Sequence, residues 1–113
     1  MAEILGSFEQ AILLSLLNPS TDFGKKGYGR AVLKEVQARL GREVSTGAVY
    51  ATLDRLESKG LLSSRTESGG EVRDNRPRRY YKVEQAGIVA LREARAANER
   101  LWAGVRLPAK GIA

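Results

Sequence analysis

The chain of 113 residues contains no cysteine and no histidine. Without cysteine it can form neither a disulfide framework nor a zinc–thiolate site, and this lack fits a reducing compartment such as the cytoplasm. Without histidine it lacks the most common general base, the most common metal ligand and the usual partner of a nucleophilic serine. We therefore expect no enzymatic activity, no metal and no cofactor.

Long hydrophobic runs are also missing. The longest apolar stretch, residues 11–17, contains Ser15 and is far shorter than the roughly 20 residues that a membrane-spanning helix needs. Positive charge, by contrast, is in excess: the formal net charge is +6 and the pI is about 10.0. A basic protein favours a polyanionic partner because neutralising phosphates releases counterions. We expect no membrane contact, and double-stranded DNA becomes a candidate partner.

A first helix is predicted over residues 8–17. Ser7 and Gln10 have the spacing of a capping box, in which two side chains satisfy free amides at the start of a helix. Apolar residues around this segment form a wide buried face at Leu5, Phe8, Ile12, Leu13, Leu14, Leu16 and Leu17. So much apolar circumference indicates that the helix makes contacts on two sides.

The next two helices form a predicted helix-turn-helix. Apolar residues four positions apart mark a helix over residues 28–40, and Gly41 is placed to end it. After a short connection Ser45 is a suitable N-cap for a third helix, which Gly60 ends. Two short helices joined by such a turn are typical of a helix-turn-helix.

Two strands are predicted directly after the third helix, over residues 61–66 and 78–83. Tyr80, Tyr81 and Val83 favour a pleated surface, and glycine, aspartate and asparagine supply turn residues between the strands. A β-hairpin at this place in the chain is the wing of a winged helix-turn-helix. The sequence therefore predicts a fold that holds DNA.

A long helix is predicted over residues 85–105, which are rich in Ala, Arg, Glu and Leu. A three-four-three-four spacing, typical of a heptad seam, joins Leu91, Ala94, Asn98, Leu101 and Val105. A domain of this size has little core to cover such a seam, so we expect a second copy of the chain to cover it.

The fold class expected is α+β, mostly α: a winged helix-turn-helix with an additional C-terminal dimerisation helix. We assign residues 1–83 to the DNA-binding domain, 84–106 to the dimerisation helix and 107–113 to a flexible tail.

Four segments together resemble the PadR family of bacterial transcriptional regulators: YGRAVLKEVQARLG, VSTGAVYATLDRLESKGLL, RPRRYYKV and the closing LW. The resemblance covers residues 6–105. It implies a winged helix-turn-helix repressor that dimerises through its C-terminal helix, with help from the first helix. It also implies that a flat aromatic compound can bind at the dimer interface, as in some members. The chain departs from the family at Glu84, where many members have threonine, and in its longer, more acidic hairpin tip.

Two groups of residues are the predicted DNA contacts. The third helix presents side chains to base edges, and the hairpin carries arginines to phosphates or the minor groove. The first group is Ser45, Thr46, Gly47, Tyr50, Ala51 and Arg55, and the second is Arg73, Arg76, Arg78 and Arg79. Each group could instead be an ordinary solvated surface, and Tyr50 could pack against the wing. Because side chains alternate along a strand, Arg78 and Arg79 face opposite ways, and at least one should face the DNA.

The predicted dimer interface combines the first and last helices, as the resemblance implies. Its residues are Leu5, Phe8, Ile88, Leu91, Ala94, Asn98, Leu101, Trp102 and Val105. Trp102, the only tryptophan, either anchors the seam or stacks on a planar aromatic effector.

We expect a homodimeric, sequence-specific DNA-binding transcriptional regulator, a repressor that binds an inverted-repeat operator and is released by a small aromatic effector. Two alternatives belong to other classes of protein. A winged-helix module can bind a protein partner instead of DNA, and a small-molecule-binding protein can use the seam at Trp102 without specific DNA binding.

Overall fold

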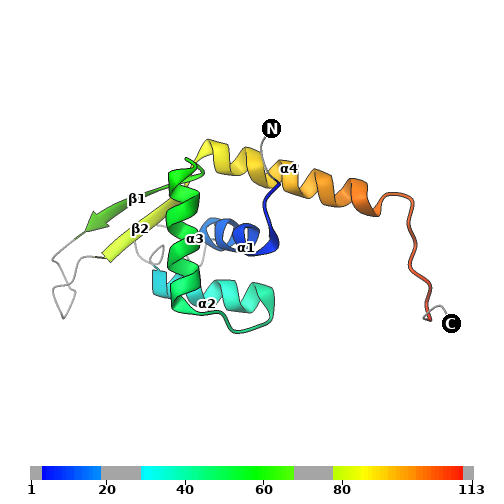
Figure 1. Ribbon diagram of the computed structural model, residues 1–113, viewed down its shortest axis with the longest axis horizontal. Helices are drawn as coiled ribbons and strands as arrows, with labels where there is room; N and C mark the ends of the chain where they lie inside the picture. Colours follow the sequence, from blue (N-terminus) through cyan, green and yellow to red (C-terminus); the bar gives the residue numbers. More distant parts are fainter. Residues whose placement is uncertain (1–3, 19–28, 68–77, 111–113) are drawn as a thin grey trace.

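The structure is a computed structural model that describes residues 4–18, 29–67 and 78–110. Its elements, in chain order, are α1 (Ser7–Leu17), α2 (Gly29–Leu40), α3 (Thr46–Ser58), β1 (Leu62–Glu67), β2 (Arg78–Val83) and α4 (Gln85–Trp102). Three helices, a two-stranded hairpin and a final helix follow in the predicted order, which confirms the mostly helical winged helix-turn-helix (Figure 1).

The hydrophobic core lies between α1, α2 and α3. Its fully buried side chains are the apolar residues that recur at helical spacing: Ile12, Leu13, Val32, Val36, Val49, Leu53 and Leu56. On α1 the predicted apolar face is too wide for this core, since Leu14 and Leu17 remain 41% and 43% exposed. These two leucines lie three positions apart and leave an apolar strip on the surface of α1.

The start of α1 differs from the prediction by one residue. The N-cap is Gly6, and its backbone N–H donates to Glu9 Oε1 at 3.2 Å. Ser7 is the first residue of the helix, and Gln10 Nε2 donates to the carbonyl oxygen of Leu5 at 2.9 Å instead of closing a capping box. The capping box of Ser7 with Gln10 is therefore wrong, because Glu9 occupies the third helical position and accepts the bond.

The turn between α2 and α3 is built as predicted. Gly41 has φ +69°, the left-handed conformation that ends α2, and its N–H donates to the carbonyl oxygen of Gln37 at 2.9 Å. The amide oxygen of the same Gln37 accepts the N–H of Val44 at 3.2 Å, which holds the chain just before Ser45. The predicted start of α2 at Tyr28 lies outside the described residues; the helix is described from Gly29.

The hairpin pairs β1 with β2 in antiparallel register, from Leu62 opposite Val83 to Glu67 opposite Arg78. Leu62 is 2% and Tyr81 8% exposed, so the strand face that carries them lies against the helices. Arg79 is two residues from Tyr81 and shares that face. The hairpin extends to one side of α3 (Figure 1).

Helix α4 crosses the base of the hairpin. Its N-cap is Glu84, whose N–H donates to the carbonyl oxygen of Leu61 at 3.0 Å. Gly87 lies so close to this point that a Cβ atom there would overlap the same carbonyl oxygen and approach Val83 Cγ1 at 2.8 Å. Only glycine allows α4 to lie this near the hairpin.

The second half of α4 extends past the rest of the molecule (Figure 1). The longest dimension of the whole molecule is 60 Å. The helix ends at Trp102, earlier than the predicted end at Val105, because Gly104 adopts φ +76°. Val105 therefore lies outside the helix, and its N–H donates to the carbonyl oxygen of Trp102 at 3.0 Å. The last position of the predicted heptad seam is thus not part of a helical seam.

Candidate nucleic-acid interface

The N-terminal half of α3 is an exposed helix surface with a capped start. Ser45 is the N-cap, as predicted, and its hydroxyl accepts the N–H of Ala48 at 3.0 Å. The residues predicted to contact bases that follow it are all exposed: Thr46, Gly47, Tyr50 and Ala51. Since the opposite side of α3 carries the buried Val49 and Leu53, the helix is anchored in the core and presents this surface outward.

One line of residues runs along the side of α3 opposite its buried stripe. We call Gly47, Ala51, Asp54 and Ser58 the outer face of α3; they are spaced four, three and four positions apart, and all are exposed. Gly47 has no atom within 4 Å of where its Cβ would lie. The outer face therefore consists of short side chains with open space in front of them.

The C-terminal end of α3 directs the chain into the wing. Gly60 has φ +76°, as its predicted role at the helix end requires, and its N–H donates to the carbonyl oxygen of Glu57 at 2.9 Å. The N–H of Leu61 donates to the carbonyl oxygen of Leu56 at 3.0 Å. Together these two bonds form a Schellman motif. The motif ends α3 and turns the chain into β1, which begins at Leu62.

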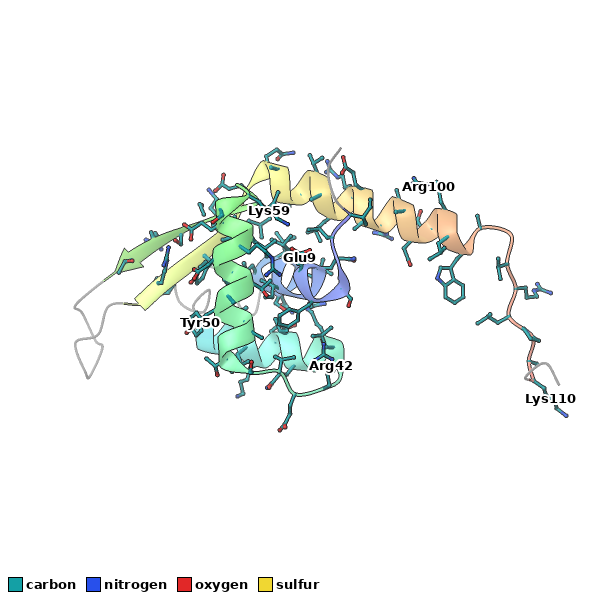
Figure 2. All side chains as sticks on the ribbon, in the orientation of Figure 1. Glu9, Arg42, Tyr50, Lys59, Arg100 and Lys110 are labelled. Atoms are coloured by element: carbon teal, nitrogen blue, oxygen red, sulfur yellow. The ribbon has the colours of Figure 1, made fainter. Side chains whose placement is uncertain are left out.

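Arg55, a predicted DNA contact, has a partner within the fold. Its Nε lies 3.6 Å from Glu9 Oε2, and Lys59 Nζ lies 3.6 Å from the same oxygen. Figure 2 shows Glu9 on α1 beside α3, with Lys59 at the end of α3. Arg55 and Lys59 therefore lie on the α1 side of α3, about 70° and 110° around the helix from the middle of the outer face. A DNA contact by Arg55 has to compete with Glu9.

Arg79, the second residue of β2, is held against α3. Its NH2 group donates to Glu57 Oε1 at 2.9 Å, and its Nε donates to Ser64 Oγ at 2.9 Å. The Ser64 hydroxyl in turn donates to Glu57 Oε2 at 2.7 Å. This triangle of Glu57, Ser64 and Arg79 joins the wing to the helix beside it. Arg79 nevertheless keeps 49% of its side chain exposed, which leaves part of the guanidinium open to solvent.

The sequence offered no sign of Glu57 or Ser64 as partners of Arg79. Glu57 and Arg79 are 22 positions apart, and no helical or strand period relates them. The hairpin register alone provides a signal, because Arg79 lies opposite Thr66, which puts Arg79 and Ser64 on the same strand face two positions out of register.

Tyr81 fills the space between the wing and α3. Its side chain is 8% exposed, and burial raises the pKa of its hydroxyl. The positive charge of Arg79 lowers that pKa, while the negative charge of Asp54 adds to the rise, followed by smaller effects of Tyr50 and Glu57. Tyr50 lies on the side of α3 from which the hairpin extends (Figure 2). It thus lies near the wing and is still 41% exposed.

Three other arginines were predicted as hairpin contacts. Arg73 and Arg76 lie outside the described residues. Arg78 is the first residue of β2, directly before Arg79, and lies opposite Glu67 in the hairpin register.

The residues predicted for the dimer interface fall into three sets: buried, half-buried and exposed. Leu5 and Ala94 are 6% and 3% exposed within a single chain, so they have almost no surface left for a partner. Phe8, Ile88 and Leu91 are half-buried, whereas the exposed set consists of Asn98, Leu101, Trp102 and Val105. Leu101 is 75% and Trp102 52% exposed.

Two kinds of site find no support in the described ranges. No three or more acidic side chains gather there as a metal-binding group would require. None of the helices there combines the length and apolar character needed to cross a bilayer.

Comparison of the sequence with known proteins identifies its family. The family model of PadR-like transcriptional regulators matches residues 14–93, from the first helix to the middle of α4. The chain belongs to the PadR family of transcriptional regulators. It is a regulator and not an enzyme, as expected from the missing histidine and cysteine.

Individual proteins agree with this assignment. The transcriptional regulator Rv3488 of Mycobacterium tuberculosis is 41% identical over 91 residues, which span 80% of this chain and 78% of the relative. A PadR family regulator from Eggerthella lenta is 32% identical, with a TM-score of 0.68 over 88% of this chain and 78% of that one. A PadR family regulator from Clostridium difficile is 28% identical, with a TM-score of 0.59 over 85% of this chain and 90% of that one.

Proposed function

We propose that this PadR-family regulator binds an inverted-repeat operator as a homodimer and represses transcription from it. Helix α3 of each protomer enters a major groove, and each wing lies along the flanking backbone or minor groove. The observation that carries this proposal is the exposed N-terminal half of α3 at Thr46, Gly47, Tyr50 and Ala51, anchored from behind by buried residues. A helix held in this way can offer side chains to base edges without moving the core.

The electrostatics of the molecule support a DNA partner. The net charge of +6 attracts the phosphates, and the part of Arg79 that remains exposed lies at the junction of wing and α3. The triangle with Glu57 and Ser64 holds this guanidinium in one position, so it loses little side-chain entropy when a phosphate approaches. Arg79 thus contributes to DNA binding both by positioning the wing and through its own charge.

The uncovered part of α4 supports a homodimer. Gly87 and Ala94 are buried on the inner face of α4, and Asn98 and Leu101 continue the same face beyond the end of the core. There the face is bare, with Leu101 75% exposed. Burial of this apolar surface against a second copy would stabilise the dimer by about 25 cal/mol for each Å² removed from water. The apolar strip of Leu14 and Leu17 on α1 offers further surface to the same partner.

A dimer joined through α4 sets the distance between the two α3 helices. Twofold symmetry then requires two half-sites about one helical turn of DNA apart, roughly 34–36 Å. A repressor acts by occupying such a site where the polymerase would bind.

Selection of bound fragments from random DNA, read by sequencing, tests the operator. The expected result is a palindrome with two half-sites, bound by a particle of twice the chain mass in size-exclusion chromatography with light scattering. Affinity should fall steeply with salt, by a thousandfold or more between about 50 and 200 mM if six or more phosphates are contacted. A monomer, or equal binding to every duplex in dilute buffer, would contradict the proposal. Salt-independent, weak DNA binding would favour a protein-interaction module.

Trp102 supports control by a planar aromatic effector at the dimer interface. Its indole is 52% exposed near the end of α4, where a partner would bring a second indole close to it. A flat ring stacked between them would change the spacing of the two protomers and so the affinity for the operator. Titration of tryptophan fluorescence with planar dyes and phenolic acids tests this: quenching together with release of operator DNA is expected. Quenching without any operator preference would instead favour a small-molecule-binding protein.

A further inference from the structure

Asp54 is the only charged residue on the outer face of α3, among Gly47, Ala51 and Ser58. It comes one turn after Tyr50 and two turns after Gly47 on an exposed surface. In a protein of net charge +6, a carboxylate on the surface proposed to meet DNA is unexpected, because phosphates repel it.

The basic side chains nearest Asp54 in sequence are occupied elsewhere. Arg55 and Lys59 both lie within 3.6 Å of Glu9 on α1. Arg79, on strand β2 of the wing, donates to Glu57 on α3. Within the parts of the chain that the structure describes, no ion pair or hydrogen bond of the Asp54 carboxylate is found. Asp54 is exposed, and although its charge acts on the nearby Tyr81 hydroxyl, no hydrogen bond joins the two, so the carboxylate keeps its acceptor capacity.

The outer face lets a short side chain reach a base edge. Gly47 has no side chain and Ala51 has only a methyl group, so nothing on this face holds the helix away from the groove floor. The aspartate carboxylate, which lies only one methylene beyond its Cα, can then meet a base directly.

An ionised carboxylate only accepts hydrogen bonds. In the major groove the amino donors are N4 of cytosine and N6 of adenine, and adenine places the acceptor N7 beside its amino group, where it repels a carboxylate. Guanine and thymine present acceptors, N7 and O6 in one and O4 in the other. Cytosine is therefore the base that a carboxylate selects.

We propose that Asp54 accepts a hydrogen bond from N4 of a cytosine in each half-site and so determines one base of the operator. The inference rests on the proposed function, since it requires α3 to lie in the major groove. Asp54 also lowers the affinity for every sequence that lacks a donor at this position, because phosphates repel a carboxylate that has no hydrogen bond to compensate. The residue increases specificity by weakening non-specific binding.

The test is selection from random DNA with the full chain and three variants: Asp54→Asn, Asp54→Ala and, as a control, Glu93→Gln. Glu93 is exposed on α4 outside the predicted seam, and Glu93→Gln makes the same change of charge as Asp54→Asn. Asparagine pairs with adenine N6 and N7, so Asp54→Asn should change one position of each half-site from cytosine to adenine. Asp54→Ala should reduce discrimination at that position by about tenfold or more and leave binding to random duplex equal or stronger. The control should keep the original palindrome.

The outcomes separate this inference from the proposed function. If the unaltered chain selects a palindrome and both Asp54 variants select the same bases with the same preferences, the assignment of Asp54 is wrong and the operator proposal stands. If the unaltered chain selects no sequence at all, both are wrong. Thermal melting of each variant confirms that it folds, which is expected because the side chain of Asp54 is exposed.

Discussion

Gly87→Ala should destabilise the protein, although alanine is the better helix former. In an exposed helix interior the change from glycine to alanine gains about 1 kcal/mol. At position 87 the new methyl group would overlap the carbonyl oxygen of Leu61 and approach Val83 Cγ1 at 2.8 Å. The carbonyl oxygen cannot turn aside, because it belongs to the backbone and accepts the N–H of Glu84 at 3.0 Å.

Overpacking of this kind costs about 1–3 kcal/mol, and a backbone obstacle puts the cost at the upper end. The expected net loss is about 1–2 kcal/mol after the gain in helix propensity is subtracted. For a chain of this length, each kcal/mol shifts the melting temperature by roughly 4 °C, so a decrease of about 4–8 °C is expected. Circular dichroism melts at one fixed protein concentration measure it, since the stability of a dimer depends on concentration.

Gly47→Ala is the matched control, because Gly47 is also helical but, unlike the buried Gly87, is exposed and has no atom within 4 Å of its Cβ position. Its melting temperature should stay the same or rise, by up to about 1 kcal/mol of stability. A Gly87→Ala protein as stable as the original would refute the close approach of α4 to the hairpin. Equal losses in both variants would attribute the effect to alanine itself and not to packing.

Four further outcomes are expected. In a double-mutant cycle by urea denaturation, Glu57→Gln and Arg79→Ala should show a coupling of about 0.5 kcal/mol, kept small because the pair is 29% and 49% exposed; additive effects would mean no interaction. The pKa of the Tyr81 hydroxyl is raised in the folded state, so the contribution of this group to stability is complete below about pH 10 and is lost as the pH rises above that value. Tyr81→Phe should therefore lose less stability between about pH 9 and 11 than the original protein. In gel-shift titrations Arg79→Ala should weaken binding to all sequences and flatten the salt dependence, whereas Thr46→Ala should relax preference at one base pair; unchanged binding in both would remove these contacts. Leu101→Asp should convert dimers to monomers in light scattering without lowering helix content, and a persistent dimer would exclude the exposed end of α4 from the interface.

Short-range signals in the sequence predicted the elements of this fold well. The glycine that ends α2 and the one that ends α3 both adopt positive φ, at Gly41 and Gly60, and Ser45 caps α3 through its own side chain. Each of these depends on atoms within a few residues of the glycine or serine, so the local sequence contains the whole cause. Gly104 carries the same signal, and its effect on the end of α4 was missed because the heptad spacing pointed to Val105.

The predicted DNA contacts were harder to assess from the sequence, because exposure does not say which way a charged side chain turns. Arg55 and Arg79 looked alike as basic residues on exposed elements. In the fold, Arg55 lies 3.6 Å from Glu9 and Arg79 donates to Glu57 at 2.9 Å. Asp54, next to Arg55 in the chain, has no ion pair or hydrogen bond among the described residues and lies on the outer face of α3.

The amino-acid pattern alone determined the identity and order of the elements, most residues of the core and the basic character of the protein. It could do so because helix periods, capping residues and net charge depend on neighbours in the chain or on composition. Only the tertiary structure decided which cations are held by carboxylates, why Gly87 has to be glycine, and where the inner face of α4 loses its cover. Each of these depends on atoms that folding brings together from distant parts of the chain, and the periodicity of the local sequence does not predict such contacts.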